Sequence, residues 1–436
     1  MKKKKFIKKI IMICLIVILI ELLAMLIMKI VREQKIDHID TLNDLIADDK
    51  NYVGVGASDF NDSKFVDKKI YSHTIPETTR EENVIATQAK LVKYDENLNI
   101  LWEKTYKGDY DSTFYSLIKD DDGYVVVGSY VSKYEQIDAD TRDAVIAKYD
   151  FDGNMKWSKT YSVLSDTEFY KIIKDGEDYI VIGQSIYENM EMGNHITGGG
   201  IIVRYSKDGE ELAHNSYGGN KSGSFNDIIP VKDGYILCGK DAANYGIIVK
   251  IKKDFNREED DKGLISKKIL WQKSYANTDM VGFTKMVLKD NIIYTVGAVN
   301  VSNEKDKDGN TIFKYDAGIV LYDTNGKYLG KHSLENDTHH RFTSVILDGD
   351  ELILTGLLDV DNYSKNGKQS SFTTKYSLKE RTFADLQKLE DDNNYIIEKM
   401  IVLNDQKVMI GTANTKCSLL YGCEYKPIIT YYEVKA

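Results

Sequence analysis

The sequence of 436 residues predicts an all-β protein, a seven-bladed β-propeller of four-stranded antiparallel blades, preceded by one N-terminal transmembrane helix. Three observations support this prediction. Residues 10–28 form an apolar run of nineteen residues. Seven related fifteen-residue segments then recur along the chain, each followed by further β-type runs. Helix-period segments are essentially absent beyond the apolar run, and the one ambiguous stretch, 385–392, falls where a strand is due.

The apolar run at residues 10–28 is interrupted only by Glu21 and is long enough to cross a membrane as a helix. Six lysines precede it and few basic residues follow closely, so the positive-inside rule places the N-terminus in the cytoplasm and the remaining chain outside the cell membrane. No small-residue cleavage site follows the run, which favours an uncleaved anchor over a signal peptide. We therefore expect four parts: a cytoplasmic basic tail (1–9), a transmembrane signal anchor (10–30), a short linker (31–40) and the propeller (41–436).

The charge of the exported part argues against one class of partner. The formal net charge of the chain is −10, and the first 35 residues carry nine basic side chains against Glu21 and Glu33. That segment is therefore at +7, which leaves about −17 for the rest of the chain. Because so acidic a body repels phosphate backbones, we expect no nucleic-acid partner.

Seven ungapped segments of fifteen residues align with one another. All share a large apolar first residue, apolar fourth and fifth residues, an apolar thirteenth or fourteenth residue and a final glycine. Each segment holds two short β-rich runs separated by Asp, Asn, Gly or Lys, which is the signature of a β-hairpin. Successive final glycines lie 55 to 72 residues apart, at Gly56, Gly128, Gly183, Gly239, Gly297, Gly356 and Gly411.

A third β-rich run follows each segment after an insertion of variable length, and a fourth run follows in most units. Residues 144–150, AVIAKYD, and 155–161, MKWSKTY, are one such pair. Four antiparallel strands per unit and a period near 55 residues fit a β-propeller better than a sandwich or a solenoid. The seventh unit ends after its third run, so closure needs either a three-stranded last blade or a strand from near 36–39 or 65–71.

These repeats resemble those of bacterial exported β-propeller proteins, whose units read D-G-G-Y, an apolar run, G, and then K-Y-D-x-x-G-N-x-x-W-x-K-T-Y. Residues 123–161 match this pattern most closely, and recognisable pieces cover 42–436. The resemblance implies that the first strand of each unit lines the central channel and that the fourth strand lies outermost. It also implies that Trp102, Trp157 and Trp271 pack between blades. It transfers no catalytic residue, because such propellers serve as binding platforms, enzymes or scaffolds.

The connections from second to third strand vary most in length, and propeller geometry places them all on one face, which we call the loop face. They span 58–87, 130–142, 185–198, 299–314, 358–369 and 413–425. A charged insertion at 256–268 is expected on the opposite face. Tyrosine mixed with Asp and Asn suits recognition of a protein or glycan surface. The candidate binding residues are Tyr71, Tyr130, Tyr134, Tyr187, Tyr363 and Tyr421.

The channel is the second candidate site. The residues expected to line it differ in type from blade to blade, so no ring of like ligands is present, and solvated channel walls are the simpler interpretation. They are Asp44, Ser116, Lys171, Asp227, Lys285, Ser344 and Glu398.

Two features of the sequence bear on cross-links and metals: a pair of cysteines and a calcium-like loop. Cys417 and Cys423 form a candidate disulfide pair, although spacing alone leaves the bridge open. Residues 150–154, DFDGN, have the oxygen spacing that opens a calcium loop, but the loop needs Gly where Met155 stands and an acid where Tyr161 stands. The Asp-Gly pair within 150–154 predicts a two-residue hairpin turn instead, and we expect no metal site.

No catalytic residue and no cofactor is expected. The seven histidines lack metal-ligand spacing, and His339 and His340 are expected in a surface turn. The first hypothesis is therefore a membrane-tethered extracytoplasmic scaffold that binds an envelope protein or a cell-wall polymer. The alternative is an extracellular glycan-active hydrolase or lyase that uses carboxylates at the propeller channel.

Overall fold

The computed structural model describes the greater part of the chain beyond residue 32. The described residues are 33–35, 41–59, 66–70, 80–84, 87–106, 111–133, 141–162, 166–189, 195–219, 223–241, 243, 245–256, 258–259, 265–266, 268–276, 282–305, 311–335, 339–358, 370–389, 394–404, 406–418 and 422–432. They form β-strands and no α-helix, as the sequence predicts. Within these ranges there is no helix long and apolar enough to cross a membrane. The expected anchor at 10–30 lies outside them.

The repeated segments form antiparallel hairpins, and each hairpin is extended by two more strands on the side of its second strand. The first sheet contains β2 (Thr41–Asp48), β3 (Asn51–Asp59), β6 (Thr87–Tyr94) and β7 (Ile100–Thr105). Later in the chain come β16 (Ser224–Val231), β17 (Gly234–Lys240), β18 (Gly246–Lys252) and β21 (Ile269–Tyr275). They are followed by β22 (Phe283–Lys289), β23 (Ile292–Lys305), β24 (Thr311–Asp323) and β25 (Tyr328–Ser333).

The next sheet contains β26 (His340–Asp348), β27 (Glu351–Leu358), β28 (Ser370–Ser377) and β29 (Gln387–Lys388). Strand β29 lies in the ambiguous stretch 385–392. It pairs with β28, with Lys388 opposite Phe372. This stretch is therefore the short outer strand of its blade and not a helix.

A sheet of eight strands lies between the sheet that begins with β2 and the sheet that begins with β16. One half contains β8 (Ser112–Asp120), β9 (Gly123–Lys133), β10 (Thr141–Tyr149) and β11 (Met155–Tyr161). The other half contains β12 (Asp166–Asp175), β13 (Asp178–Asn189), β14 (His195–Tyr205) and β15 (Glu211–Gly219). The halves meet at a single parallel pair, Arg142 in β10 and Asp166 in β12. Each half otherwise has the four-strand order of the other sheets.

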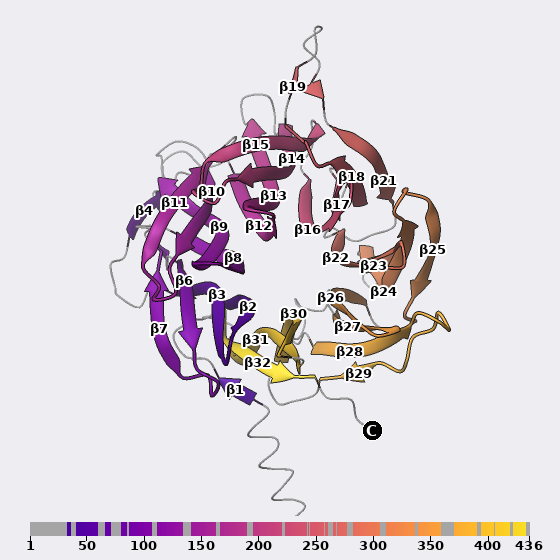
Figure 1. Ribbon diagram of the computed structural model, residues 1–436. Coiled ribbons are helices and arrows are strands. Elements are labelled where there is room, and N and C mark those ends of the chain that lie inside the picture. Colours follow the sequence, from indigo (N-terminus) through magenta and orange to yellow (C-terminus); the bar gives the residue numbers. More distant parts are fainter. Residues whose placement is uncertain are drawn as a thin grey trace, which may run out of the picture.

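The sheets surround a central axis like the blades of a propeller (Figure 1). Strands β2, β8, β12, β16, β22, β26 and β30 (Asn394–Leu403) are innermost and contact one another in this order. Strand β30 also contacts β2, which closes the ring. The predicted β-propeller built from repeats is therefore confirmed.

The ring closes through a strand from the N-terminal side of the first blade. The last sheet contains β30, β31 (Gln406–Ser418), β32 (Gly422–Tyr431) and β1 (Glu33–Lys35). Strand β1 lies in the segment expected as a linker and directly precedes 36–39, one of the two ranges that the sequence leaves open. The other range contributes β4 (Val66–Ile70), which pairs with β5 (Arg80–Val84). The last blade is thus four-stranded.

Each blade is buried on both faces because its neighbours pack against it. Along β9, Val126 packs against the preceding blade, whereas Val127 packs against the following one. This explains why the second run of each segment is apolar throughout instead of alternating. The first and last blades are joined in the same way, by a cluster that contains Leu45 and Ile410.

Several connections expected as loops are hairpin arms. The strand pairs β13–β14, β23–β24 and β31–β32 continue far into 185–198, 299–314 and 413–425 before they turn. Strands β4 and β5 form another hairpin within 58–87. The charged insertion at 256–268 forms its own small hairpin, β19 (Glu258–Glu259) and β20 (Ile265–Ser266), which projects outward from the ring (Figure 1).

The tryptophans pack against the turn of the following blade, which confirms their predicted place between blades. Gly209, with φ of 80°, lies in the turn between β14 and β15, and a Cβ atom there would be 2.8 Å from the Trp157 ring. Trp102 and Trp271 face the glycines of the equivalent turns in the same way. Only a residue without a side chain leaves room for the indole.

We expect Gly209→Ala to destabilise the fold by roughly 2 to 4 kcal/mol, because alanine is strained at positive φ and its methyl group overlaps the Trp157 ring. Gly176→Ala is the matched control: its φ is 67°, but no atom lies within 4 Å of the added Cβ. It should cost only about 1 kcal/mol. Urea midpoints of the full chain in non-ionic detergent measure the difference. Equal losses in the two variants would contradict the packing of Trp157 on this turn.

Candidate functional site

A β-bulge interrupts every inner strand at the same position of the repeat. The register shifts between the first and third residues of the segment, as between Phe114 and Ser116 in β8. The same shift occurs in β2, β12, β16, β22, β26 and β30. A bulge sets two residues opposite one partner. The segment's final glycine pairs there, and a Cβ on Gly128 would lie 1.9 Å from the Thr113 carbonyl oxygen. The bulge therefore accounts for the repeated glycine.

The second residue of a segment ties its strand to the next inner strand. Asn43 Nδ2 donates to the Phe114 carbonyl oxygen at 2.7 Å, and Thr343 Oγ1 donates to the Ile397 carbonyl oxygen at 3.0 Å. Each bond ends at the residue that precedes the neighbour's bulge. The third residue of the segment carries the polar group that contacts residues of other inner strands.

Asp44 is the most enclosed carboxylate of the predicted channel set. Lys399 Nζ lies 2.5 Å from Asp44 Oδ1, and Ser116 Oγ donates to Asp44 Oδ2 at 2.9 Å. Burial opposes ionisation of Asp44, but the ammonium groups of Lys399 and Lys171 and these hydrogen bonds outweigh it and lower its pKa. Lys399 is the third residue of its segment, so it holds the position that the sequence analysis gave to its neighbour Glu398.

Lys285 reaches across the ring. Its Nζ donates to Ser344 Oγ at 3.3 Å and to the Met400 carbonyl oxygen at 3.4 Å. Ser344 lies in the next inner strand and Met400 in the one after it, so this ammonium group is directed toward the centre. Asp227 Oδ2 accepts the Met286 amide at 3.1 Å. The predicted channel residues other than Glu398 are thus brought into one polar cluster, in which Asp227 and Asp44 both act on the Lys285 ammonium group.

The cluster is rich in lysine. Burial, followed by repulsion from Lys171, lowers the pKa of Lys285, although Asp227 and Asp44 oppose the change. Burial likewise lowers the pKa of Lys399 to about 7, even though Asp44 counteracts it, and Lys171 and Lys285 lower it further. The three ammonium groups therefore lie close enough to repel one another.

Glu398 differs from the other predicted channel residues. Its side chain is reached by solvent. Even so, desolvation by the surrounding protein raises its pKa, and the charge of Arg341 opposes this rise. Because it is the second residue of its segment, it does not occupy the position of Asp44 or Lys399.

A buried carboxylate that the sequence analysis missed lies at the loop-face end of β12. Glu168 accepts hydrogen bonds from five side chains of two neighbouring blades. They are Tyr115 at 3.2 Å, Ser129 at 3.2 Å, Arg142 at 3.3 Å, Tyr170 at 2.7 Å and Gln184 at 2.8 Å. Both carboxylate oxygens of Glu168 accept hydrogen bonds, and Arg142 balances the charge. Glu168 therefore has a structural role in connecting the two blades.

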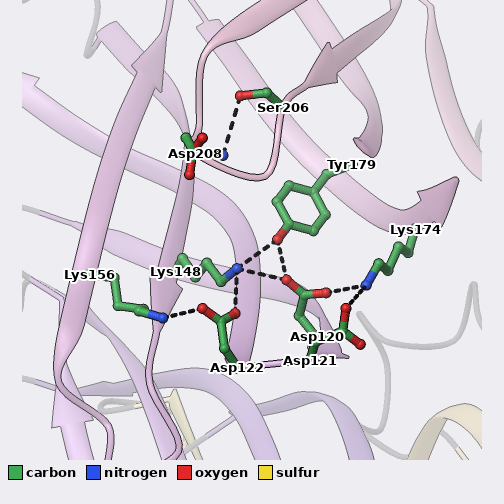
Figure 2. Close-up of polar contacts among 9 residues, drawn as sticks. All are labelled: Asp120, Asp121, Asp122, Lys148, Lys156, Lys174, Tyr179, Ser206 and Asp208. Atoms are coloured by element: carbon green, nitrogen blue, oxygen red, sulfur yellow. Dashed lines mark hydrogen bonds and ion pairs between the residues drawn. The ribbon is translucent and has the colours of Figure 1, made fainter. Parts of the chain in front are cut away.

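A second missed network lies at the hairpin turns opposite the loop face (Figure 2). Asp120, at the end of β8, binds Lys148 at 2.7 Å and also binds Lys174 and the hydroxyl of Tyr179. Lys148 in turn donates to Tyr179 at 3.0 Å and pairs with Asp122 at 2.6 Å. Burial and the bond to Asp120 raise the pKa of Tyr179 to about 12. The tyrosine comes from the next blade, so the network links two blades.

The same arrangement recurs at neighbouring interfaces. Asp48 binds Lys93 at 2.8 Å, Lys119 at 2.5 Å and the Tyr124 hydroxyl at 2.7 Å. Asp175 accepts the hydroxyl of Tyr235 at 2.5 Å. The lysine of K-Y-D and the tyrosine of D-G-G-Y in the repeat pattern therefore have a structural role between blades.

Few of the predicted loop-face tyrosines fall on described side chains. Tyr71, Tyr134, Tyr363 and Tyr421 lie outside the described residues. The backbone of Tyr187 pairs with that of Thr197 in the β13–β14 arm. The half-buried ring of Tyr130 packs against Tyr106, with ring centroids 6.0 Å apart. Tyr130 therefore contributes to packing between blades.

The two candidate disulfide cysteines lie directly opposite each other. Cys417 in β31 and Cys423 in β32 are register partners near the tip of their arm. Cys238 is a free and fully buried thiol.

The turn at 150–154 binds its own backbone. Asp150 Oδ1 accepts the amides of Asp152 at 3.0 Å and Asn154 at 2.8 Å. The amide of Gly153 bonds to the Asp150 carbonyl and that of Asp150 to the Asn154 carbonyl, so the loop has three residues, not the predicted two. Among the residues that the structure describes, no group of three or more His, Cys, Asp or Glu is placed to hold a metal.

His340 corrects one further expectation. It is fully buried at the start of β26, and its Nε2 lies 2.6 Å from the Leu334 carbonyl oxygen. The expected surface turn is therefore wrong for this residue, because the inner strand begins two residues before the segment that ends at Gly356.

Comparison with known proteins gives structural neighbours only. No protein-family model matches the chain, and no curated protein sequence matches it. Among solved structures, the chain is similar to the WD40 domain of Pan2 from Neurospora crassa, with TM-score 0.42 and 10% identity over 80% of this chain and 86% of that one. It is also similar to a candidate 6-phosphogluconolactonase from Bacteroides fragilis, with TM-score 0.45 and 8% identity over 88% and 99%. A Bacteroides caccae protein of unknown function gives TM-score 0.33 and 10% identity over 69% and 89%.

The Asp48 network predicts a pH dependence of stability. Burial opposes its ionisation, but bonds from Lys119, Lys93 and Tyr124 lower its pKa from 3.8 to about 2. A lowered acid pKa contributes stability above pH 3.8 that disappears as the pH falls toward 2. Asp48→Asn should therefore lose about 2 kcal/mol at neutral pH, and its urea midpoint should converge with that of the wild type in acid. Asp152→Asn, at an exposed turn position, is the control. A constant gap between wild type and Asp48→Asn down to pH 2 would refute this account.

Proposed function

We propose that the protein is a membrane-tethered, extracytoplasmic seven-bladed β-propeller that binds an envelope protein or a cell-wall polymer through its loop face, without chemistry of its own. The observation that carries the proposal is the set of hairpin arms on that face. Strand pairs β13–β14, β23–β24 and β31–β32 all extend beyond their blades at the same end.

The blade count of seven is supported by the repeats and by the topology. Seven segments are present in the sequence, and each supplies an inner strand to the ring. The eight-stranded sheet divides naturally into two blades, because only the pair Arg142 and Asp166 joins its halves. Strand β1 then supplies the fourth strand of the last blade.

The place of β1 supports an orientation of the body on the membrane. Lys35 lies opposite Ile428 and Glu33 opposite Thr430, so β1 runs toward the loop face. The predicted anchor therefore approaches from the opposite face. Residues 31 and 32 alone separate the anchor from β1, a reach of about 10 Å. The hairpin arms would then point away from the membrane, where an envelope partner is accessible.

The enzyme alternative is favoured by one observation. Two carboxylates of adjacent inner strands have pKa values shifted in opposite directions, that of Asp44 downward and that of Glu398 upward. Such a pair is what acid and base roles require. Against it, Asp44 is buried and already paired with Lys399.

An envelope-binding experiment tests the loop face. In one variant, residues 414–425 are replaced by Asn-Gly, which removes the tip of the β31–β32 arm while Ala413 still pairs with Lys426. In the matched control, residues 258–266 of the β19–β20 hairpin are removed instead. Full chains in non-ionic detergent are incubated with isolated envelope material. We expect the arm variant to be retained about tenfold less and the control to be retained like the wild type.

Equal retention of all three proteins would overturn the choice of face. Release of reducing sugar ends from wall polysaccharide, abolished by Glu398→Gln, would establish the enzyme alternative in place of pure binding.

The extracytoplasmic location predicts a disulfide between Cys417 and Cys423, because oxidised cysteine pairs persist outside the cytoplasm and these residues are direct register partners. Mass mapping of the full chain after thiol blocking and non-reducing digestion should recover the linked peptide. Cys238, buried and free, should be blocked only after unfolding, which controls for incomplete labelling. Recovery of both Cys417 and Cys423 as blocked free thiols would contradict the bridge.

A further inference from the structure

Three lysines occupy the bulge position that faces the centre of the ring. Lys171, Lys285 and Lys399 are each the third residue of their segment, in β12, β22 and β30. The part of the chain beyond residue 35 carries a net charge of about −17, so a concentration of cations at its axis runs against its overall composition.

Direct partners neutralise only one of these lysines. Lys399 pairs with Asp44 at 2.5 Å. Within the described ranges, Lys285 donates only to the uncharged oxygens of Ser344 and Met400, at 3.3 and 3.4 Å. The ammonium group of Lys171, half-buried, has no hydrogen bond or ion pair among the residues that the structure describes.

The balance of charge at the centre is positive. Three ammonium groups face the carboxylates of Asp44 and Asp227, which leaves a net charge of +1 when all are ionised. Glu398 is faced by Arg341 and adds nothing to the balance. Partly buried like charges are costly unless a counter-charge lies between them.

We propose that the centre of the ring binds a small oxyanion of the phosphate or sulfate class, held by Lys171 and Lys285 with Lys399 as the third cation. A dianion offsets the positive charge left after Asp44 and Asp227, and it gives Lys171 and Lys285 the direct anionic contact that no described residue makes with them. Lysine is a point-charge donor that suits phosphate oxygens. Ser344 Oγ, which accepts a hydrogen bond from Lys285 Nζ at 3.3 Å, fixes the direction of that ammonium group.

The site should depend on pH. Lys399 is faced by Asp44, Lys171 and Lys285, and its pKa of about 7 means that it loses its proton near neutrality when no anion is bound. A bound anion stabilises the protonated amine, so binding takes up protons, and affinity falls as the pH rises above 7. Sulfate remains a dianion across this range and is the probe for the pH profile.

The test is isothermal titration of the full chain in non-ionic detergent with inorganic phosphate, at ionic strength held constant with chloride. Lys171→Gln is the informative variant, because it removes a cation that makes no direct bond and so should leave the fold intact; its thermal midpoint without phosphate verifies this. Lys207→Gln, at an exposed turn position, is the matched control. We expect one phosphate per chain, affinity reduced about tenfold or more in Lys171→Gln, and unchanged affinity in Lys207→Gln.

Separate titrations with inorganic phosphate, sulfate and methyl phosphate distinguish a free anion from a terminal phosphate group on a larger molecule. The proposal fails if the wild type gives no saturable heat with any of the three. It also fails if Lys171→Gln binds like the wild type, or if Lys207→Gln loses as much affinity as Lys171→Gln. The outcome is independent of the loop-face experiment, since neither variant touches the hairpin arms.

Discussion

Packing of each sheet between two neighbours is the interaction on which the rest of the molecule depends. Val126 and Val127, adjacent in β9, serve opposite interfaces, so neither face of the blade is available to water. A sheet built in this way is stable only if the series of blades closes on itself, because an open series would leave one apolar face exposed at each end. The pairing of β1 with β32 and the cluster around Leu45 and Ile410 satisfy that requirement.

The strands of the blades could be predicted from sequence because their signals are local. An apolar run that ends in glycine and a hairpin turn are both contained within fifteen residues. Closure could not be predicted in the same way. Strand β1 consists of Glu33, Gln34 and Lys35, which have no apolar pattern, and only the free backbone edge of β32 selects them. The three-residue turn at 150–154 was missed for a related reason, since Asp-Gly suits both loop lengths.

The channel residues could be predicted in part, because each repeated segment begins with the inner strand that lines the channel. The bulge then changes the phase by one residue, which the alternation of a regular strand does not reveal. Lys399, not Glu398, consequently meets Asp44. The interblade networks were missed although their residues belong to the repeat pattern, because the hydroxyl of Tyr179 meets an aspartate 59 residues earlier in the chain. Repetition shows that a residue matters, but not which neighbour it contacts.

The interblade networks also show how this fold treats buried charge. Between the sheets that begin with β16 and β22 both residues are apolar instead, and Val231 and Ile293 pack in one cluster at the equivalent place. Between the sheets that begin with β26 and β30 a lysine replaces the tyrosine, and Lys407 pairs with Asp348 at 2.8 Å. Enclosed charge at these interfaces is thus either paired or removed, as its desolvation cost requires. The centre of the ring departs from this rule at Lys171, and a departure from an otherwise regular pairing is where a ligand is to be sought.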